Sequence, residues 1–181
     1  MIPRLYILAG VPGCGKSTWA KFFFNEYQIV SSDAIRAEKW PGEPYVAERN
    51  VEVFDVFHDR IDQMLYKGGQ VVADATSLND RARTRLRLLA KKNGAECHLV
   101  FFNNLGQALE RNAGRDRDPN LQDWVPYEAM EFMVKKWHET KAAIIDEEYT
   151  SITSIEGTYV TTAADTADDP PTDRAAAAIP G

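Results

Sequence analysis

A segment near the N-terminus combines the residue types needed to hold a chain of phosphates. Residues 10–17 read GVPGCGKS and match the pattern G-x-x-x-x-G-K-[ST] in full. Glycines let the backbone curl so that several N–H groups point inward at a phosphate. Lys16 can reach the β- and γ-phosphates, and the hydroxyl of Ser17 can ligate Mg²⁺. The expected contacts to a nucleoside triphosphate are Gly10, Pro12, Gly13, Cys14, Gly15, Lys16, Ser17 and Thr18.

Asp33 and Arg36 could handle the group that receives the phosphate. They follow a short apolar run at 29–31, which we expect to be a strand, and ligands of open parallel sheets bind where strands end. A carboxylate there can take the proton of an attacking hydroxyl. A guanidinium one helical turn later can grip a phosphate in a fork. An ion pair at the start of a helix, with Asp33 as the N-cap, explains the same spacing equally well.

Two further motifs contain residues suited to phosphate chemistry. Asp74-Ala75-Thr76 closes another expected strand, where Asp74 could pair with Arg36, orient water near Mg²⁺ or serve as an ordinary turn residue. Residues 111–117 (RNAGRDR) join a helix end, a glycine and three arginines. Such a segment can close over a nucleotide and neutralise charge in transit, and a generic basic loop has the same composition.

Arginines recur at every second position from Arg81 to Arg87. On a helix they form two stripes, Arg81 with Arg85 and Arg83 with Arg87. A groove for a nucleic-acid backbone and an ordinary solvated helix face are both compatible with this pattern.

Short apolar runs alternate with helical patterns along the chain. Strands are expected at residues 5–9, 29–31, 70–73, 97–102 and 151–155. Helices are expected at residues 17–27, 33–40, 46–67, 79–92, 105–112 and 126–148. This alternation predicts a parallel sheet covered by helices on both faces.

The composition is that of an ordinary globular protein, with 181 residues, 44% hydrophobic and 27% charged. No apolar run approaches the roughly 20 residues that a bilayer needs. No secretory signal is visible, and two cysteines fit a reducing compartment, so we expect a cytoplasmic protein without a membrane partner. Residues 161–181 are rich in Ala, Thr, Asp and Pro and lack aromatic residues. We expect one domain at 1–160 followed by a disordered or loosely attached acidic tail.

The formal net charge of −6 does not exclude a nucleic-acid partner. Residues 161–181 hold four aspartates and one arginine, whereas residues 81–117 hold nine basic residues and three acidic ones. Binding depends on such local patches rather than on the average.

Taken together, the motifs resemble the kinase domain of bacteriophage and bacterial 5′-hydroxyl polynucleotide kinases, over about residues 4–140. The matching stretches are Gly10–Ala20, Ser32–Arg36, Val71–Arg81, Glu110–Arg115 and Val125-Pro126. The resemblance implies an α/β P-loop kinase with a five-stranded parallel sheet in the order 2-3-1-4-5, helices on both faces and a small arginine-rich lid.

The resemblance also implies roles on the side of the phosphate donor. Lys16 and Ser17 match residues that bind the phosphates of ATP and Mg²⁺. Arg115 matches the lid arginine that grips the ATP phosphates, and Arg111 is expected to assist it. Arg117 is a further candidate that has no secure counterpart.

On the acceptor side, Asp33 matches the family's general base, and Arg36 matches the arginine that contacts the phosphate backbone of the acceptor. Asp74 and Thr76 match the acceptor site as well. The asparagine typical of that motif is shifted, or replaced by Ser77, in this sequence.

The activity implied by the resemblance is transfer of the γ-phosphate of ATP to 5′-hydroxyl ends of DNA or RNA, with a nucleic-acid ligase as a partner. No D-x-D-x-[TV] stretch is present, so 3′-phosphatase activity is not expected. Two alternatives stay open: a kinase of a small acceptor such as a nucleoside, sugar or antibiotic, and a nucleotide-dependent switch without transfer chemistry.

Overall fold

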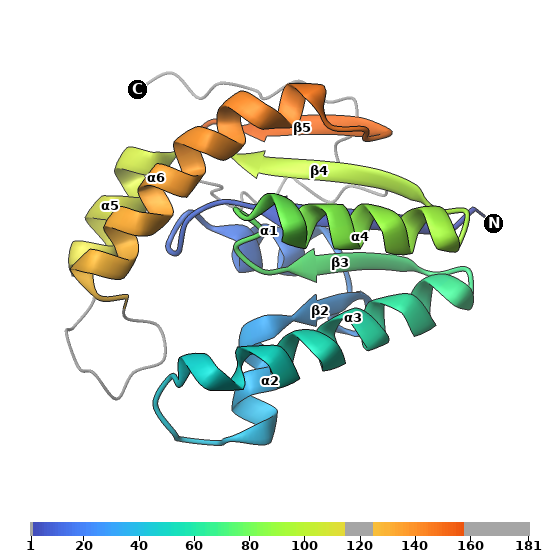
Figure 1. Cartoon of the computed structure of the whole chain (residues 1–181), viewed down its shortest axis with the longest axis horizontal. Helices are drawn as coiled ribbons and strands as arrows, with labels where there is room; N and C mark the ends of the chain where they lie inside the picture. Colours follow the sequence, from blue (N-terminus) through green and yellow to red (C-terminus); the bar gives the residue numbers. More distant parts are fainter. Residues whose placement is uncertain (1, 115–124, 158–181) are drawn as a thin grey trace.

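A five-stranded, all-parallel sheet organises the computed structural model, which describes residues 2–114 and 125–157 (Figure 1). The strand order is β2-β3-β1-β4-β5, so the expected order 2-3-1-4-5 is confirmed. Its strands are β1 Arg4–Ala9, β2 Ile29–Ser31, β3 Gln70–Asp74, β4 Glu96–Phe102 and β5 Ser151–Ile155. The expected tail at 161–181 lies outside the described residues.

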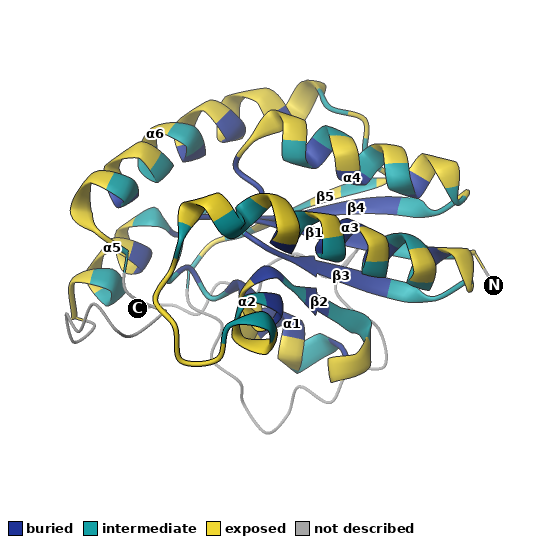
Figure 2. Cartoon of the chain, turned by 60° about the horizontal axis from the view of Figure 1, so that its bottom comes forward, coloured by how far each residue is buried: buried dark blue, intermediate teal, exposed yellow. Residues whose placement is uncertain are grey.

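Helices cover both faces of the sheet, with α3, α4 and α6 on one face and α1 on the other (Figures 1 and 2). The α-helices are α1 Lys16–Phe23, α2 Ser32–Lys39, α3 Asn50–Tyr66, α4 Asp80–Lys92, α5 Leu105–Gly114 and α6 Tyr127–Ala143. Short 3-10 turns are η1 Glu26–Gln28, η2 Ala47–Arg49 and η3 Ile144–Asp146. Within residues 2–114 and 125–157, no helix is both long and apolar enough to cross a membrane.

Three of the expected helices are too long. The first ends at Phe23 because Asn25 caps a separate turn, in which the Asn25 N–H donates to the side chain of Gln28. The helix expected from residue 46 begins at Asn50, after η2, and the one expected to reach 148 ends at Ala143 in η3. Helix boundaries depend on such local caps more than on apolar spacing.

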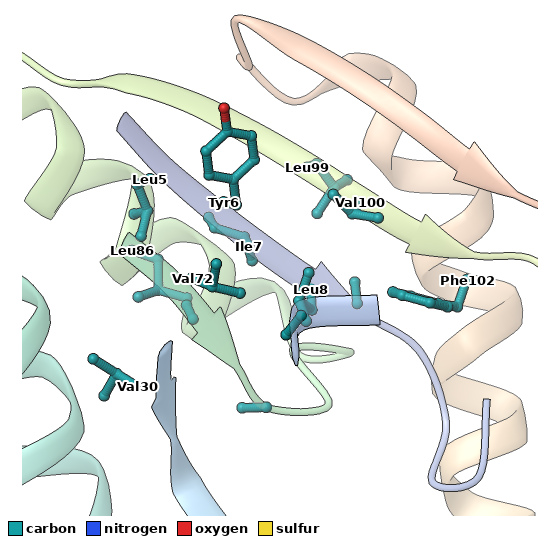
Figure 3. Close-up of a cluster of buried hydrophobic side chains, with 14 of the residues drawn as sticks. Leu5, Tyr6, Ile7, Leu8, Val30, Val72, Leu86, Leu99, Val100 and Phe102 are labelled. Atoms are coloured by element: carbon teal, nitrogen blue, oxygen red, sulfur yellow. The ribbon is translucent and has the colours of Figure 1, made fainter. Parts of the chain in front are cut away.

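The core lies between β1 and the helices on either side of it. Leu5, Ile7 and Leu8 (Figure 3) have no exposed surface. Trp19 of α1 is 1% exposed. Because helices cover both faces, β1 is a continuous apolar run rather than an alternating one. Burial along the central strands contrasts with the exposed outer faces of the helices (Figure 2).

The strand register brings the candidate residues to one edge of the sheet. Ser31 pairs with Asp74 at the end of β2 and β3, and Ala9 pairs with Phe101 near the end of β1 and β4. The segments that follow these strands therefore meet at the carboxyl edge, where ligands of open α/β sheets bind.

Candidate active site

Residues 10–17, which we call the phosphate loop, form a tight backbone turn between β1 and α1. A Cβ at Gly10 would lie 2.6 Å from Cys14 Sγ and 2.9 Å from the Cβ of Phe102, so only glycine fits. Gly13 has a φ of +84°, a region that side chains disfavour. Cys14 fills the space inside the turn and is 2% exposed. The sequence pattern thus corresponds to a loop whose shape requires glycine at position 10, because of close packing, and at position 13, because of its backbone angle.

Lys16 lies across the phosphate loop. Its Nζ donates to the carbonyl oxygens of Gly10 at 3.1 Å and Val11 at 2.9 Å, and the residue is 9% exposed. The ammonium group is therefore fixed over the loop by the loop's own backbone. A charge held in this way is preorganised for phosphate, since little side-chain freedom is left to lose on binding.

Two side chains brace the phosphate loop from outside. Asn104, just beyond the end of β4, donates from Nδ2 to the carbonyl oxygens of Cys14 and Gly157, both at 2.9 Å. Arg111 of α5 donates to the carbonyl oxygen of Gly13 at 3.0 Å. The structure thus places Arg111 against the loop backbone, its expected role at the ATP phosphates stays a prediction, and Arg115 and Arg117 lie outside the described residues. Sequence reasoning missed Asn104, although its position at the carboxyl end of a strand was a usable signal.

Asp33 and Arg36 lie on the first turns of α2 and form an ion pair. Arg36 donates to Asp33 Oδ1 at 2.7 Å, and the side chain of Asp33 is 83% exposed against 16% for Arg36. Asp33 is not the N-cap, because the hydroxyl of Ser31 accepts the bond from the N–H of Ala34. The carboxylate of Asp33 therefore has no capping role and stays open to solvent.

A second partner of Arg36 comes from the start of α3. Arg36 also donates to Oδ1 of Asn50 at 2.8 Å. Both outer nitrogens of the guanidinium are thus bonded, one to Asp33 and one to Asn50. Asn50 was not singled out by the sequence, since nothing local signals a contact made across 14 residues.

Asp74 is buried beside the phosphate loop and is 5% exposed. Burial raises the pKa of its carboxyl, while hydrogen bonds with Ser17 and Ser31 and the charge of Lys16 lower it, and the charge of Asp33 raises it further. The sequence left three roles open for Asp74: pairing with Arg36, orienting water near Mg²⁺, or serving as a turn residue. Its proximity to Ser17 and Lys16 favours the role near Mg²⁺ over a pair with Arg36.

The residues beside Asp74 fit a magnesium ion. A serine hydroxyl and an acidic side chain are the usual protein ligands of Mg²⁺ in P-loop proteins, and the phosphates and water complete the octahedron. Ser17 and Asp74 provide these two groups in contact. Across the described ranges, no group of three or more His, Cys, Asp or Glu side chains is arranged for a metal.

Beyond Asp74, the segment leading to α4 is tied to the phosphate loop and to the far helices. The N–H of Gly10 donates to the carbonyl of Thr76 at 3.0 Å. Ser77, with a φ of +43°, is 5% exposed, and its carbonyl accepts a bond from Arg83. Thr76 therefore contacts the phosphate loop through its backbone carbonyl. A role for the Thr76 hydroxyl in the acceptor site stays a prediction.

Arg83 corrects the interpretation of the arginine stripes. It is 1% exposed, pairs with Glu147 and also donates to Thr140 of α6, so it belongs neither to a nucleic-acid groove nor to a solvated face. The Glu147 carboxyl accepts this pair and a bond from Tyr149, and together these contacts hold its pKa below the usual value against burial. Arg83 instead connects the segment that follows Asp74, through the carbonyl of Ser77, to Thr140 of α6 and to Glu147.

Residues 5–139 match a protein family described as an AAA domain. The chain belongs to this family. The match includes the phosphate loop, Asp33, Arg36 and Asp74, so each of these residues lies in the AAA domain.

Solved structures share the fold of this AAA domain. A chain of the Pnkp1/Rnl/Hen1 RNA repair complex is 19% identical with a TM-score of 0.63, covering 82% of this chain and 47% of that one. A putative kinase from Chloroflexus aurantiacus is 14% identical with a TM-score of 0.59, covering 88% and 90%. A gluconokinase from Sinorhizobium meliloti is 17% identical with a TM-score of 0.51, covering 86% and 83%.

At these identities the structures establish a shared fold, that of P-loop kinases, and nothing narrower. The AAA domain spans about half the length of the repair-complex chain that it matches. No curated protein sequence matches the chain significantly.

Proposed function

We propose that this AAA domain is an ATP-dependent polynucleotide kinase that transfers the γ-phosphate of ATP to 5′-hydroxyl ends of DNA or RNA. The observation that carries the proposal is the placement of the Asp33–Arg36 pair, whose carboxylate is exposed, at the same edge of the sheet as the phosphate loop. The sequence motifs and the fold shared with a chain of an RNA repair complex support it.

On the donor side, the phosphate loop binds ATP. Lys16 neutralises the β- and γ-phosphates, while Ser17 and Asp74 hold Mg²⁺. The bound Mg²⁺ supplies positive charge that offsets the charge of the transferring group. Arg111 and Arg115 also bind the phosphates of ATP, with Arg115 as the arginine of a small lid.

On the acceptor side, Asp33 accepts the proton of the attacking 5′-hydroxyl, and Arg36 binds the adjacent phosphate of the strand. An exposed carboxylate suits this role because the hydroxyl must approach from solvent. Thr76 completes the acceptor side. A nucleic-acid ligase, which consumes 5′-phosphate ends, is the partner that would act after this kinase in the same pathway.

The fold shared with a gluconokinase favours one alternative, a kinase of a small hydroxylated acceptor. Incubation with γ-labelled ATP separates the two, using a 5′-hydroxyl oligonucleotide, its 5′-phosphorylated twin and a panel of nucleosides and sugars. Label on the 5′-hydroxyl oligonucleotide alone supports the polynucleotide kinase. Label on a small acceptor alone supports the alternative, and label on no acceptor would mean a nucleotide-dependent switch.

Replacing the proposed base tests the chemistry within the site. Asp33→Asn should lower the rate of transfer by about 10²- to 10⁴-fold, the usual contribution of a general base, and leave ATP binding nearly intact. Glu38→Gln is the matched control, because Glu38 lies on the same helix and pairs with Arg60. Near-normal turnover by Asp33→Asn would exclude Asp33 as the base.

A further inference from the structure

The segment between α2 and α3 presents an aromatic ring beside the predicted acceptor residues. Tyr45 is 58% exposed, although large apolar side chains are usually covered. The guanidinium carbon of Arg36 lies 5.4 Å from the centre of the Tyr45 ring. Figure 1 shows this segment at the end of the molecule toward which the strands point.

Side-chain contacts fix the orientation of the Tyr45 ring. Nδ2 of Asn50 donates to the Tyr45 hydroxyl at 2.7 Å, and the same Asn50 accepts a bond from Arg36. Arg36 in turn is paired with Asp33. Four residues from three segments therefore form one connected cluster, and the ring is held at its hydroxyl and by a cation.

Asp33, Arg36 and Tyr45 of this cluster line a surface pocket that also includes a second cation–aromatic pair. Asp33, Arg36, Trp40, Tyr45 and Arg49 all contribute to its walls. The guanidinium carbon of Arg49 lies 4.6 Å from the centre of the Trp40 ring, and Arg49 is paired with Glu43. The pocket thus combines aromatic surfaces with two guanidinium groups, each paired with an exposed carboxylate, Asp33 or Glu43.

This combination matches the chemistry of a nucleotide. An aromatic ring offers a flat surface on which any nucleobase can stack, and an arginine can bind the phosphate that joins the terminal nucleotide to the next one. A neutral sugar or another small polyol could pack on the ring, but it carries no phosphate for the two arginines to bind.

We propose that Tyr45 stacks on the nucleobase of the terminal nucleotide of the acceptor strand while Asp33 takes the proton of its 5′-hydroxyl. The inference rests on the proposed polynucleotide kinase function and adds a recognition element to its acceptor side. Stacking does not distinguish one base from another, so the element selects a strand end that carries a base rather than a particular sequence.

The test combines removal of the Tyr45 ring with removal of the terminal nucleobase. Wild type and Tyr45→Ala are each given two 5′-hydroxyl oligonucleotides, one ordinary and one whose terminal sugar lacks its base. We expect the wild type to prefer the ordinary acceptor by about tenfold in kcat/KM, a typical effect of one stacked base. Tyr45→Ala should lose that preference, and Tyr45→Phe should keep it because the ring remains.

Two controls separate stacking from damage to the site. Tyr66→Ala removes another exposed tyrosine, at the other end of α3, and should behave as wild type. KM for ATP should be unchanged in Tyr45→Ala, because Tyr45 makes its contacts with Asn50 and Arg36 rather than with the phosphate loop.

The possible results distinguish this inference from the function on which it rests. If Tyr45→Ala slows both acceptors equally, or if the wild type does not distinguish them, Tyr45 acts only through Arg36 and the stacking proposal is overturned while the kinase stands. If the wild type labels neither oligonucleotide, the proposed function and the stacking proposal both fail.

Discussion

The donor side and the acceptor side of the site are built in different ways. In the phosphate loop, Gly10, Val11, Cys14 and Lys16 are buried, and backbone carbonyls of the loop accept the bonds from Lys16. The connected residues Asp33, Arg36, Tyr45 and Asn50, which we call the acceptor cluster, are more exposed and held by side chains, with Arg36 joining Asp33 to Asn50. A preorganised backbone site binds the same phosphate chain in every cycle, whereas a side-chain cluster can adapt to the strand end that it receives.

This difference predicts how each side responds to substitution. Changes in the phosphate loop should affect both folding and activity, because its residues fill the core as well as the site. Changes in the acceptor cluster should affect activity with little cost in stability, since exposed ion pairs contribute only about 0–1 kcal/mol.

The largest effect is expected for Lys16→Ala. Loss of the ammonium group removes the charge over the β- and γ-phosphates and should lower the rate of transfer at least about 100-fold. Weaker ATP binding should accompany the slower rate, because the same contact is made before and during transfer. Initial rates of label transfer and titration with ATP measure both.

Lys39→Ala is the matched control for this variant. Lys39 is a cation on α2 that pairs with Glu52 rather than with the phosphate loop. It should keep its ATP affinity. If Lys39→Ala weakened ATP binding as much as Lys16→Ala, the separation of donor side from acceptor side would be wrong.

The same contrast explains what the sequence could predict. The phosphate loop occupies eight consecutive residues, so its whole pattern is visible in one short stretch of sequence. The strand order followed from a resemblance rather than from spacing, and it is correct. Asn50 and Tyr45 were missed because contacts made by side chains on separate elements leave no local pattern.

Arg83 shows the limit of sequence periodicity. Its spacing within α4 is that of its neighbours Arg81 and Arg85, yet it is 1% exposed and paired with Glu147, which lies 64 residues away. A charged residue enters the core only where a partner meets it. The partner is supplied by tertiary structure, which helical spacing alone does not contain.

Two glycines with similar φ angles, Gly13 in the phosphate loop and Gly42 between α2 and α3, allow the stability of the two sides to be compared. A Cβ at Gly13 (φ +84°) would lie 3.0 Å from the carbonyl oxygen of Ala108, whereas one at Gly42 (φ +74°) would meet nothing within 4 Å. Gly13→Ala should therefore cost about 2–3 kcal/mol and Gly42→Ala about 1 kcal/mol of unfolding free energy. Urea unfolding measures both, and equal losses would show that the phosphate loop is no more constrained than the exposed segment.

For Asp74 we expect a smaller effect on the free energy of unfolding, and its replacement should increase stability rather than lower it. Burial raises the pKa of this carboxyl, so the folded state favours the protonated form and loses stability as the pH rises through the raised pKa. Asp74→Asn should therefore stabilise the nucleotide-free protein at neutral pH by about 1 kcal/mol. The difference from wild type should vanish at acidic pH, and the same variant should lose Mg²⁺-dependent transfer.

Thermal unfolding across pH, without and with ATP and Mg²⁺, measures this effect. The ligands should stabilise the wild type more than Asp74→Asn, because only the wild type offers a carboxylate to the metal. A variant less stable than wild type at neutral pH would show that the charge of Lys16 and the bonds from Ser17 outweigh the cost of burial.

The smallest effect concerns His58, a buried residue of α3, the helix that begins at Asn50. Burial lowers the pKa of its imidazole below the ordinary 6.5, assisted by the charge of Arg85 and opposed by a backbone hydrogen bond at Phe54 and the charge of Asp55. The folded state thus favours neutral histidine, and stability is lost as the pH falls through 6.5 toward the lowered value. One such group changes the unfolding free energy by at most about 1.4 kcal/mol per pH unit.

His58→Phe should flatten the stability profile between about pH 5 and 7. Part of the slope should remain, because burial lowers the pKa of His98 in β4 as well, where Glu96 raises it and Arg4 lowers it. The two histidines lie in different parts of the fold, so their contributions should add. If His58→Phe left the slope unchanged while a His98 variant removed it, the pH response would come from the central sheet and not from the helix beside the acceptor cluster.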